Sequence, residues 1–225
     1  MSIRAIAELV ALITPPVCAA CRAPLDDADR MVCAACLRAL PWIRRGCVRC
    51  GLPRHRRGGC PAGGAAFAAA WAPLAYEGVA RELVQALKFR GALPLAGVMA
   101  AQMVANLPPP LRGVDAIVPV PPHPGRRHRR GFDPAGRLSA AVATRLSLPL
   151  EACLRRHGGH RQVGAARAER RDPHRFAIEL RRAPPARVLL VDDVHTTGAT
   201  LDACARALVA GGCEWVGAVS YARTL

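Results

Sequence analysis

The sequence contains few aromatic residues, few acidic residues and one lysine. Phe, Tyr and Trp make up 4% of the 225 residues, and Lys88 is the single lysine beside an excess of arginine. The 16 acidic residues are outnumbered by 32 basic ones, which gives a formal net charge of +16. This charge favours partners that carry phosphate, whether nucleotide, nucleic acid or anionic lipid. The shortage of aromatics predicts that any nucleic-acid contact is confined to the backbone, because base stacking needs aromatic faces.

The sequence also lacks a long apolar run and an export signal. Residues 1–14 carry an apolar stretch that is too short to span a bilayer and has no small-residue cleavage site. The apolar residues of this stretch recur on one helical face, which predicts an N-terminal helix over residues 1–14 that docks on the rest of the chain. They are Ile3, Ile6, Ala7, Val10 and Ile13. We therefore expect a cytoplasmic protein without a membrane span.

Cysteines are concentrated near the N-terminus, where seven of the ten lie between residues 18 and 60. In a reducing compartment such crowding favours metal binding over disulfides. The pairs Cys18/Cys21 and Cys33/Cys36 each have two intervening residues, and eleven residues separate the pairs. Four thiolates at this spacing can converge on one tetrahedral zinc ion. The sequence therefore predicts a structural zinc site.

A second group of thiols, Cys47, Cys50 and Cys60, is one ligand short of another zinc site. Gly63 stands where the second cysteine of a closing pair is expected. His55 is the nearest substitute, because imidazole is a common zinc ligand. Its arginine-rich surroundings are equally typical of a solvated loop, so both interpretations stay open, as does that of thiols without metal.

The rest of the sequence alternates between strand and helix patterns, which predicts an α/β domain with a mainly parallel sheet covered by helices on both faces. Cys153, Cys204 and Cys213 lie in apolar contexts and are predicted to be small core residues. The expected strands lie at residues 71–76, 115–120, 176–180, 188–191 and 214–222. The expected helices lie at residues 79–89, 93–107, 134–146 and 201–210.

The most informative segment follows the apolar strand at residues 188–191. Asp192 and Asp193 come directly after it, and a small hydroxyl-rich turn at residues 196–200 leads into a helix. Ligands of open α/β sheets bind at the carboxyl ends of strands, and a helix N-terminus offers N–H groups to an anion. Because carboxylates accept hydrogen bonds from sugar hydroxyls, this order predicts a ribose phosphate site.

A second candidate binding segment follows the predicted strand at residues 115–120. Forked guanidinium groups suit a pyrophosphate group exposed at a strand end. A solvated basic loop or a nucleic-acid contact would have the same composition. The arginines concerned are Arg126, Arg127, Arg129 and Arg130.

Together these segments resemble the ComF family, whose members are competence-associated proteins with a zinc ribbon before a phosphoribosyltransferase domain. The family usually has eight ribbon cysteines where this chain has seven, and Gly-Phe-Asn-Gln where this chain has Gly-Phe-Asp-Pro at residues 131–134. Asp133 and Pro134 still suit the start of a helix. The matching segments are the cysteine ribbon, residues 83–90, residues 117–121 with 129–132, residues 162–170, and residues 187–201 with 213–223.

The resemblance implies a type I phosphoribosyltransferase-like domain over residues 67–225, after the helix at 1–14 and a zinc ribbon at 15–66. It implies a site for 5-phosphoribosyl-1-pyrophosphate (PRPP), or a related ribose phosphate, bound with magnesium. Asp192 and Asp193 would hold the ribose hydroxyls. The 5-phosphate would contact the turn that follows, namely Thr196, Thr197, Gly198, Ala199 and Thr200.

Two functions are compatible with this resemblance. One is a PRPP-dependent transferase, for which purine salvage is disfavoured because Thr196 stands where enzymes of this fold that act on 6-oxopurines carry a carboxylate. The other is a non-catalytic competence factor that binds single-stranded DNA and works with the DNA-uptake machinery. We assign no acid–base role to His195, which we expect to face solvent or pack locally. The DNA contacts would come from residues 155–175 and from Arg44, Arg45, Arg49, Arg54, Arg56 and Arg57.

Overall fold

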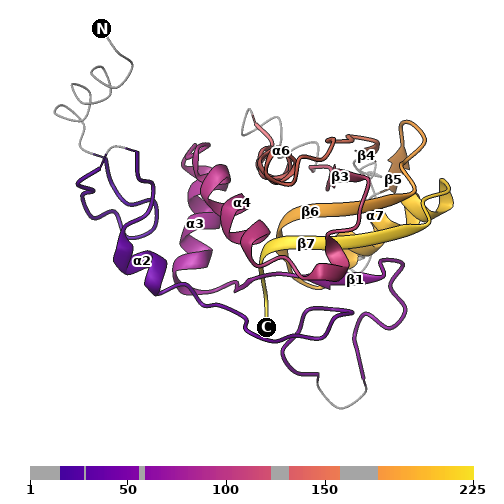
Figure 1. Cartoon of the computed structure of the whole chain (residues 1–225), viewed down its shortest axis with the longest axis horizontal. Helices are drawn as coiled ribbons and strands as arrows, with labels where there is room; N and C mark the ends of the chain where they lie inside the picture. The colour runs from indigo at the N-terminus through magenta and orange to yellow at the C-terminus, as the bar shows by residue number, and fades with distance from the viewer. Residues whose placement is uncertain (1–15, 28, 56–58, 123–131, 158–176) are drawn as a thin grey trace, which may run out of the picture.

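The computed structural model describes residues 16–27, 29–55, 59–122, 132–157 and 177–225. Its centre is a parallel sheet with the strand order β1-β7-β6-β3, in which β2 also pairs with β7 (Figure 1). The strands are β1 (Ala69–Trp71), β2 (Leu74–Ala75), β3 (Ala116–Pro119), β6 (Arg187–His195) and β7 (Trp215–Arg223). The predicted α/β class with a mainly parallel sheet is confirmed.

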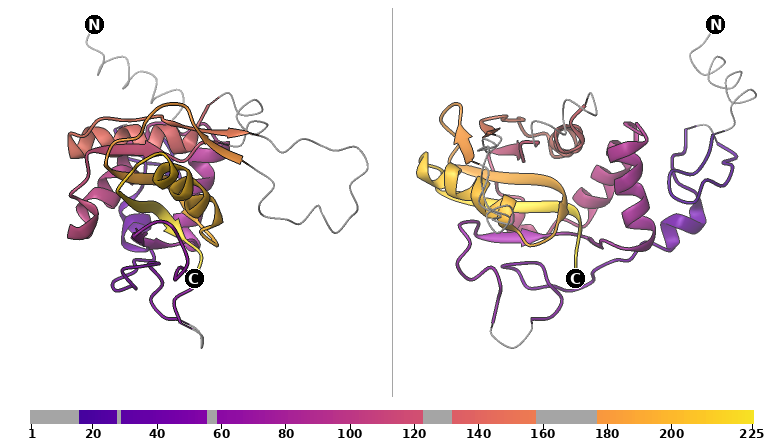
Figure 2. Two further views of the ribbon diagram at one scale, coloured as in Figure 1. Left: turned by 90° about the vertical axis from the view of Figure 1, so that its right-hand side faces the viewer. Right: turned by 180° about the vertical axis from the view of Figure 1, so that it is seen from behind.

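Helices cover both faces of this sheet. Helices α3, α4 and α6 share one apolar cluster with one face, while α7 belongs to a second cluster on the other (Figure 2). Among the described helices, none is both long and apolar enough to cross a bilayer. The bounds are α2 (Ala34–Arg38), α3 (Gly78–Phe89), α4 (Leu95–Ala105), η1 (Pro109–Leu111), α6 (Pro134–Leu146) and α7 (Ala199–Ala210).

The side chains of β6 divide between these two clusters in alternation. Leu189 and Val191 pack with α3, α4 and α6, whereas Val188 and Leu190 pack with α7. All four are fully buried. A strand buried on both faces needs a continuous apolar run, because successive side chains point to opposite sides. The pattern at residues 188–191 therefore predicted the central strand correctly.

Three elements differ from the sequence prediction. The expected strand at 71–76 is divided into β1 and β2, with Pro73 between them, because proline has no N–H to donate to the neighbouring strand. Strand β6 continues to His195 instead of ending at Val191. The strand near 176–180, observed as β5 (Ala177–Leu180), pairs antiparallel with the unpredicted β4 (Leu154–His157) in a separate two-stranded sheet.

The cysteine-rich segment packs on the α/β core in two places. We call the segment with Cys18, Cys21, Cys33 and Cys36 the first knuckle and the segment with Cys47, Cys50 and Cys60 the second knuckle. Cys18 and Cys36 of the first knuckle belong to the same apolar cluster as α3. Cys50 of the second knuckle belongs to the cluster that contains α7. In Figure 1 the first knuckle lies beside α2 and α3, and the chain then runs along the sheet to the second. The predicted helix at residues 1–14 lies outside the described residues.

Candidate functional site

A pocket of about 300 Å³ lies where the carboxyl ends of β3 and β6 meet the N-termini of α6 and α7. This is the edge of a parallel sheet at which ligands are expected, because several strand ends and helix N-termini converge there. Carboxylate, ammonium, guanidinium and hydroxyl groups line it. The lining residues are Tyr76, Lys88, Val120, Pro121, Pro122, Phe132, Asp133, Pro134, Ala135, Arg156, Asp192, Asp193, Val194, Thr196 and Thr200.

The two adjacent carboxylates enter this pocket from opposite faces of the sheet. Asp193 lies two residues after Val191 in β6, so its side chain points to the same face of the sheet, toward α3. There Lys88 Nζ lies 2.7 Å from Asp193 Oδ1. Asp192 Oδ1 accepts a hydrogen bond of 2.8 Å from the backbone N–H of Asp193. The two carboxylates therefore have different partners: Asp193 forms an ion pair with Lys88, and Asp192 accepts a hydrogen bond from the backbone.

This difference leaves Asp192 with an unusual pKa. Burial raises the pKa of Asp192 to about 7, and the negative charge of Asp193 adds to the increase. The backbone N–H of Asp193 and the charge of Lys88 oppose it. A carboxyl group that is partly protonated near neutral pH can ionise when a cation or a hydroxyl donor arrives. The charge of this carboxyl would therefore respond to a cation or a hydrogen-bond donor that enters the pocket.

Lys88 is a site residue that the sequence analysis did not identify. It lies in the last turn of α3, about a hundred positions before the acidic pair along the chain, so local pattern could not connect them. One signal was available: in a chain that otherwise uses arginine throughout, the single lysine stands out. Lysine is a compact point charge, and the forked guanidinium of arginine does not replace it in a close contact.

The turn at residues 196–200 is shaped by Gly198. Its φ is +83°, in the left-handed region, and a Cβ there would lie 2.8 Å from His195 Nε2. Thr197 Oγ1 accepts a 3.4 Å hydrogen bond from the N–H of Ala199, where α7 begins. Of the five predicted phosphate-binding residues, Thr196 and Thr200 line the pocket. Thr197, Gly198 and Ala199 form the intervening part of the turn.

His195 is buried, so the expectation that it packs locally is confirmed and solvent exposure is excluded. Its ring meets Phe67 edge-on, with 6.5 Å between the centroids. Burial, followed by the charge of Arg223, lowers the pKa of His195 to about 4. The imidazole is therefore neutral at physiological pH and supports the turn by packing.

Arg156 is a second cationic residue of the pocket that sequence reasoning did not single out. It was part of a long basic stretch, and its position became apparent because β4 pairs with β5 beside α7. Asp133, at the start of α6, adds a third carboxylate to the pocket wall. Arg126, Arg127, Arg129 and Arg130 lie outside the described residues, so their predicted contact with pyrophosphate stays a prediction.

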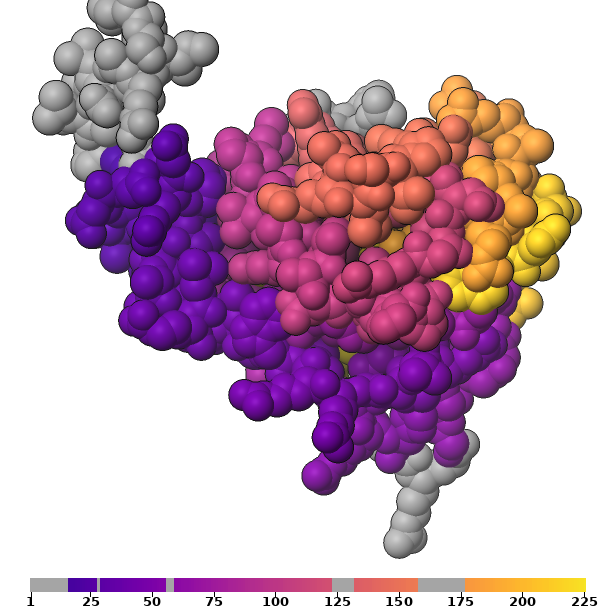
Figure 3. Space-filling model, viewed as in Figure 1, coloured from indigo at the N-terminus to yellow at the C-terminus, as the bar shows by residue number. Residues whose placement is uncertain are grey.

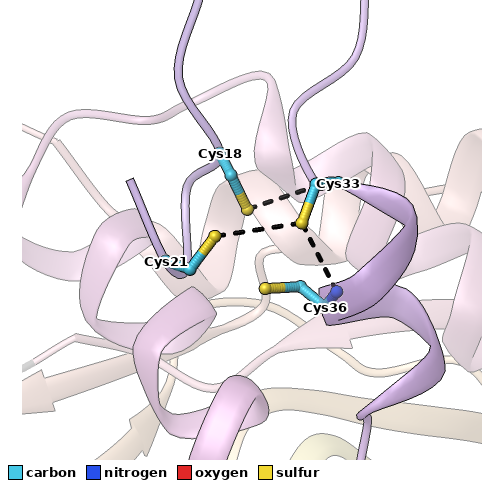
Figure 4. Close-up of side chains that lie close together, drawn as sticks. All are labelled: Cys18, Cys21, Cys33 and Cys36. Atoms are coloured by element: carbon cyan, nitrogen blue, oxygen red, sulfur yellow. Dashed lines mark hydrogen bonds between the residues drawn. The ribbon is translucent and has the colours of Figure 1, made fainter. Parts of the chain in front are cut away.

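The first group of cysteines has the geometry of a tetrahedral thiolate site. The four ligand atoms lie within 4.8 Å of one another, and Cys21 Sγ is 3.8 Å from Cys33 Sγ (Figure 4). With zinc–sulfur bonds of about 2.3 Å, sulfur atoms of a tetrahedron lie about 3.8 Å apart. Backbone N–H groups of Cys33 and Cys36 donate to Cys18 Sγ and Cys33 Sγ. The donor set and spacing fit structural zinc.

The pKa values of two thiols in this first group are shifted in opposite directions. Burial acts to raise the pKa of the Cys18 thiol, but hydrogen bonds from the backbone of Cys33, Cys21 and Ala20 outweigh this effect and lower it to about 6. Burial raises the pKa of Cys36, and the neighbouring thiols add to the increase. Four thiols this close cannot all ionise without a cation among them, because their charges repel. A divalent ion removes that cost and is expected to hold the knuckle together.

The second group includes His55. Cys47, Cys50, His55 and Cys60 place their ligand atoms within 4.8 Å of one another. Cys50 Sγ lies 3.2 Å from His55 Nε2, and Cys47 Sγ lies 4.0 Å from Cys60 Sγ. Three thiolates and one imidazole form a common structural zinc set. Of the two interpretations of His55, the structure favours that of the fourth ligand, which replaces the missing cysteine.

Comparison with known proteins adds an independent result. The double zinc ribbon domain family matches residues 9–63. DNA utilization protein YhgH of Salmonella typhi is 28% identical over 231 residues, which cover 95% of this chain and 100% of that protein. Competence protein F of Haemophilus influenzae is 34% identical over 115 residues, which cover 48% of this chain and 50% of that protein. The Salmonella typhimurium protein named DNA utilization protein YhgH is 27% identical over 227 residues.

Proposed function

We propose that this chain, which is similar to proteins named for competence and DNA utilization, is a ComF-family protein that binds PRPP in the pocket at the carboxyl edge of its sheet and serves the uptake or use of DNA. The role in DNA use is inferred from relatives that are named for competence and DNA utilization. The observation that carries PRPP binding is the arrangement of Asp192, Asp193 and Thr200 around one pocket, beside the N-terminus of α7.

Each part of PRPP has a matching group in this pocket. The 5-phosphate would lie at the turn before α7, where the first N–H groups of the helix lack partners within it. Asp192 and Asp193 would accept hydrogen bonds from the two ribose hydroxyls. Lys88 and Arg156 would balance the charge of the pyrophosphate, with the arginines at residues 126–130 as additional candidates.

The pocket also fits magnesium, which accompanies PRPP. Magnesium prefers hard oxygen ligands and is usually held by one or two carboxylates together with substrate phosphates. Asp133, Asp192 and Asp193 supply such oxygens. When bound, magnesium would neutralise the pyrophosphate leaving group. The protein groups would then position the ribose and stabilise charge, which is most of what phosphoribosyl transfer requires.

Transfer would form a bond from a nitrogen nucleophile to C1 of the ribose as the C1–oxygen bond to pyrophosphate breaks. The released proton would pass from the nucleophile to solvent or to a neighbouring base. His195 is buried, and its pKa is lowered to about 4, so it is not the group that we assign to this step. We therefore propose PRPP binding as the function of the pocket, with transfer as the further activity to be tested.

Calorimetric titration of the protein with PRPP and magnesium tests this proposal. We expect saturable binding that weakens when Asp192 is changed to asparagine. A second readout is available because Lys88 is the one lysine of the chain. PRPP should slow the modification of Lys88 by an amine-reactive reagent, measured by mass spectrometry of the peptide that contains it. If folded, zinc-loaded protein showed no binding of PRPP and no protection of Lys88, the proposal would be refuted. Pyrophosphate release with a nitrogen acceptor would establish transfer.

A further inference from the structure

A surface around Trp42, far in sequence from the pocket residues at 192–200, has an exposed indole, exposed arginines and two hollows. Trp42 lines both hollows and is 40% exposed. One hollow, of about 480 Å³, is lined by Trp42, Ile43, Arg44, Trp71, Pro73, Asn106 and Pro108. The other, of about 430 Å³, is lined by Pro41, Trp42, Ile43, Arg44, Arg45, Pro53, Ala75, Glu77 and Leu225.

The backbone beneath this surface is fixed by pairing with the edge of the main sheet. Trp42 forms an antiparallel bridge with Leu74. The N–H of Ile43 donates to Pro73 O at 2.7 Å, and the N–H of Ala75 donates to Pro41 O at 2.9 Å. Figure 3 shows the face on which the violet segment that follows α2 borders the magenta surface of α4 and η1. The exposed Trp42 therefore lies on a segment that is hydrogen-bonded to the edge of the sheet.

The charge of this surface is predominantly positive. Arg44 and Arg45 are exposed, and neither forms an ion pair with another residue that the structure describes. Glu77 is the one acidic residue lining either hollow, and it belongs to the hollow without Trp71. The hollow that contains Trp42 and Trp71 thus offers two indoles and a guanidinium, with the amide of Asn106 at its margin.

We propose that this surface binds single-stranded DNA, with a base stacked on Trp42 in the hollow shared with Trp71 and the adjoining phosphates on Arg44 and Arg45. Base–aromatic stacking together with arginine contacts to the backbone is how sequence-independent single-strand binding is achieved. The inference rests on the proposed role in DNA use and names the surface for it. It departs from the expectation of backbone contact alone, because the exposed Trp42 lies beside the exposed Arg44 and Arg45 and offers a face for stacking.

Arg49 does not belong to this surface, although its sequence context suggested a DNA contact. Its guanidinium donates to the carbonyl oxygens of Ala62, Ala65 and Ala68 at 3.2, 2.7 and 3.0 Å. Three hydrogen bonds to the backbone commit it to holding the second knuckle against β1. An Arg49 variant would therefore report on folding, whereas Arg44 and Arg45 variants report on binding.

The test uses the full-length, zinc-loaded protein and two labelled strands of equal length, an oligothymidine and an abasic strand with the same phosphates. Fluorescence anisotropy measures both affinities. We expect Trp42→Ala to weaken oligothymidine binding by about tenfold or more, the size of one base–aromatic stack, and to leave the abasic strand nearly unaffected. The double change Arg44→Ala and Arg45→Ala should weaken both strands and lower the salt slope by about 1.4, at about 0.7 for each phosphate.

Matched controls separate binding from general damage. Leu37→Ala removes an apolar side chain with 39% exposure, close to that of Trp42, from outside both hollows. Arg145→Ala removes an exposed arginine from the last turn of α6. Both control variants should bind oligothymidine as the unchanged protein does. Trp42→Phe should retain most of the affinity, because it keeps an aromatic face.

Three results would overturn the inference: no oligothymidine binding by the unchanged protein, unchanged binding by Trp42→Ala, or equal losses on both strands in that variant. The last result would mean that Trp42 acts through the fold or through charge placement. PRPP titration of the same samples keeps the two proposals apart. Trp42→Ala should bind PRPP normally, and Asp192→Asn should bind oligothymidine normally, so either proposal can fail alone.

Discussion

Lys88 Nζ lies 2.7 Å from Asp193 Oδ1, and this ion pair joins the end of α3 to the central strand β6 at the wall of the pocket. The side chains of Lys88 and Asp193 are 21% and 11% exposed, so the pair is only partly shielded from water. Lys88 supplies a positive charge to a carboxylate that lies next to that of Asp192. It also keeps a cation within reach of any phosphate that enters the pocket.

Removal of the lysine charge should destabilise the protein more than removal of both charges. We expect Lys88→Met to lower the free energy of unfolding by about 1–3 kcal/mol, between the values for exposed and fully buried pairs. The double variant Lys88→Met with Asp193→Asn should recover much of this loss, because neither charge is then left alone. The two single variants, the double variant and the unchanged protein form a double-mutant cycle, measured by thermal or denaturant unfolding. If the losses of unfolding free energy in the single variants added up to that of the double variant, the pair would not be coupled.

Asp192 is expected to contribute to ligand binding at little cost to the fold. Its carboxyl is buried and its pKa is raised, so Asp192→Asn should leave the thermal midpoint unchanged or slightly higher. PRPP affinity should fall by about tenfold to a hundredfold, since hydrogen bonds to a charged group contribute about 1.5–3 kcal/mol each. Ribose 5-phosphate should show the same loss and inorganic pyrophosphate a much smaller one. Calorimetry with the three ligands decides between this pattern and a uniform effect.

The raised pKa of Asp192 predicts a specific dependence on pH. Because its pKa is about 7 in the folded protein and 3.8 ordinarily, this group stabilises the fold at low pH, and that contribution is lost as pH rises through about 7. The unfolding free energy of the unchanged protein relative to Asp192→Asn should therefore decrease from about pH 4 to pH 7 and level off at higher pH. PRPP affinity should rise from about pH 6 to pH 8 as the carboxylate of the folded protein ionises, and equal pH profiles in the two proteins would refute both expectations.

Zinc content tests the assignment of His55. The unchanged protein should contain two zinc ions, one for each group of four ligands. Cys36→Ser should lose one, and His55→Ala should weaken the other, while His55→Cys should retain both because it restores a fourth thiolate. Elemental analysis after dialysis against a weak chelator gives the counts. If His55→Ala held its zinc as firmly as the unchanged protein, His55 would not be a ligand.

The effect of metal loss on the fold differs between the two knuckles. Zinc binding supplies folding energy for small modules, so Cys36→Ser should unfold the first knuckle and weaken its contact with α3, including the 2.6 Å hydrogen bond from Arg90 to Ala19 O. Loss of the second zinc should disturb the buried Arg223, which donates to Cys50 O beside β6. Hydrogen exchange of each segment measures these local effects.

From the sequence, most of the helices and strands of the main domain could be predicted, together with the candidate ligands that are close along the chain, whereas β4 and the division of the first strand into β1 and β2 could not. The apolar run at residues 188–191 predicted a buried strand, and the order of strand, acidic pair and turn predicted a ligand site at the end of that strand. Paired cysteines specified the first zinc site for the same reason, since ligands a few residues apart are brought together by local backbone geometry.

Relationships between distant residues depended on the packing of the whole chain. This packing places Lys88 of α3 and Arg156 of β4 at the pocket and brings Trp42 and Trp71 to one hollow. It also brought His55 to the second group of thiols. These contacts depend on how helices pack on the sheet and which strands pair, and both follow from burial of apolar faces contributed by the whole chain. The sequence around a residue does not specify that packing. The position of Lys88 and Arg156 at the pocket, and the hollow that Trp42 shares with Trp71, therefore became apparent only in the fold.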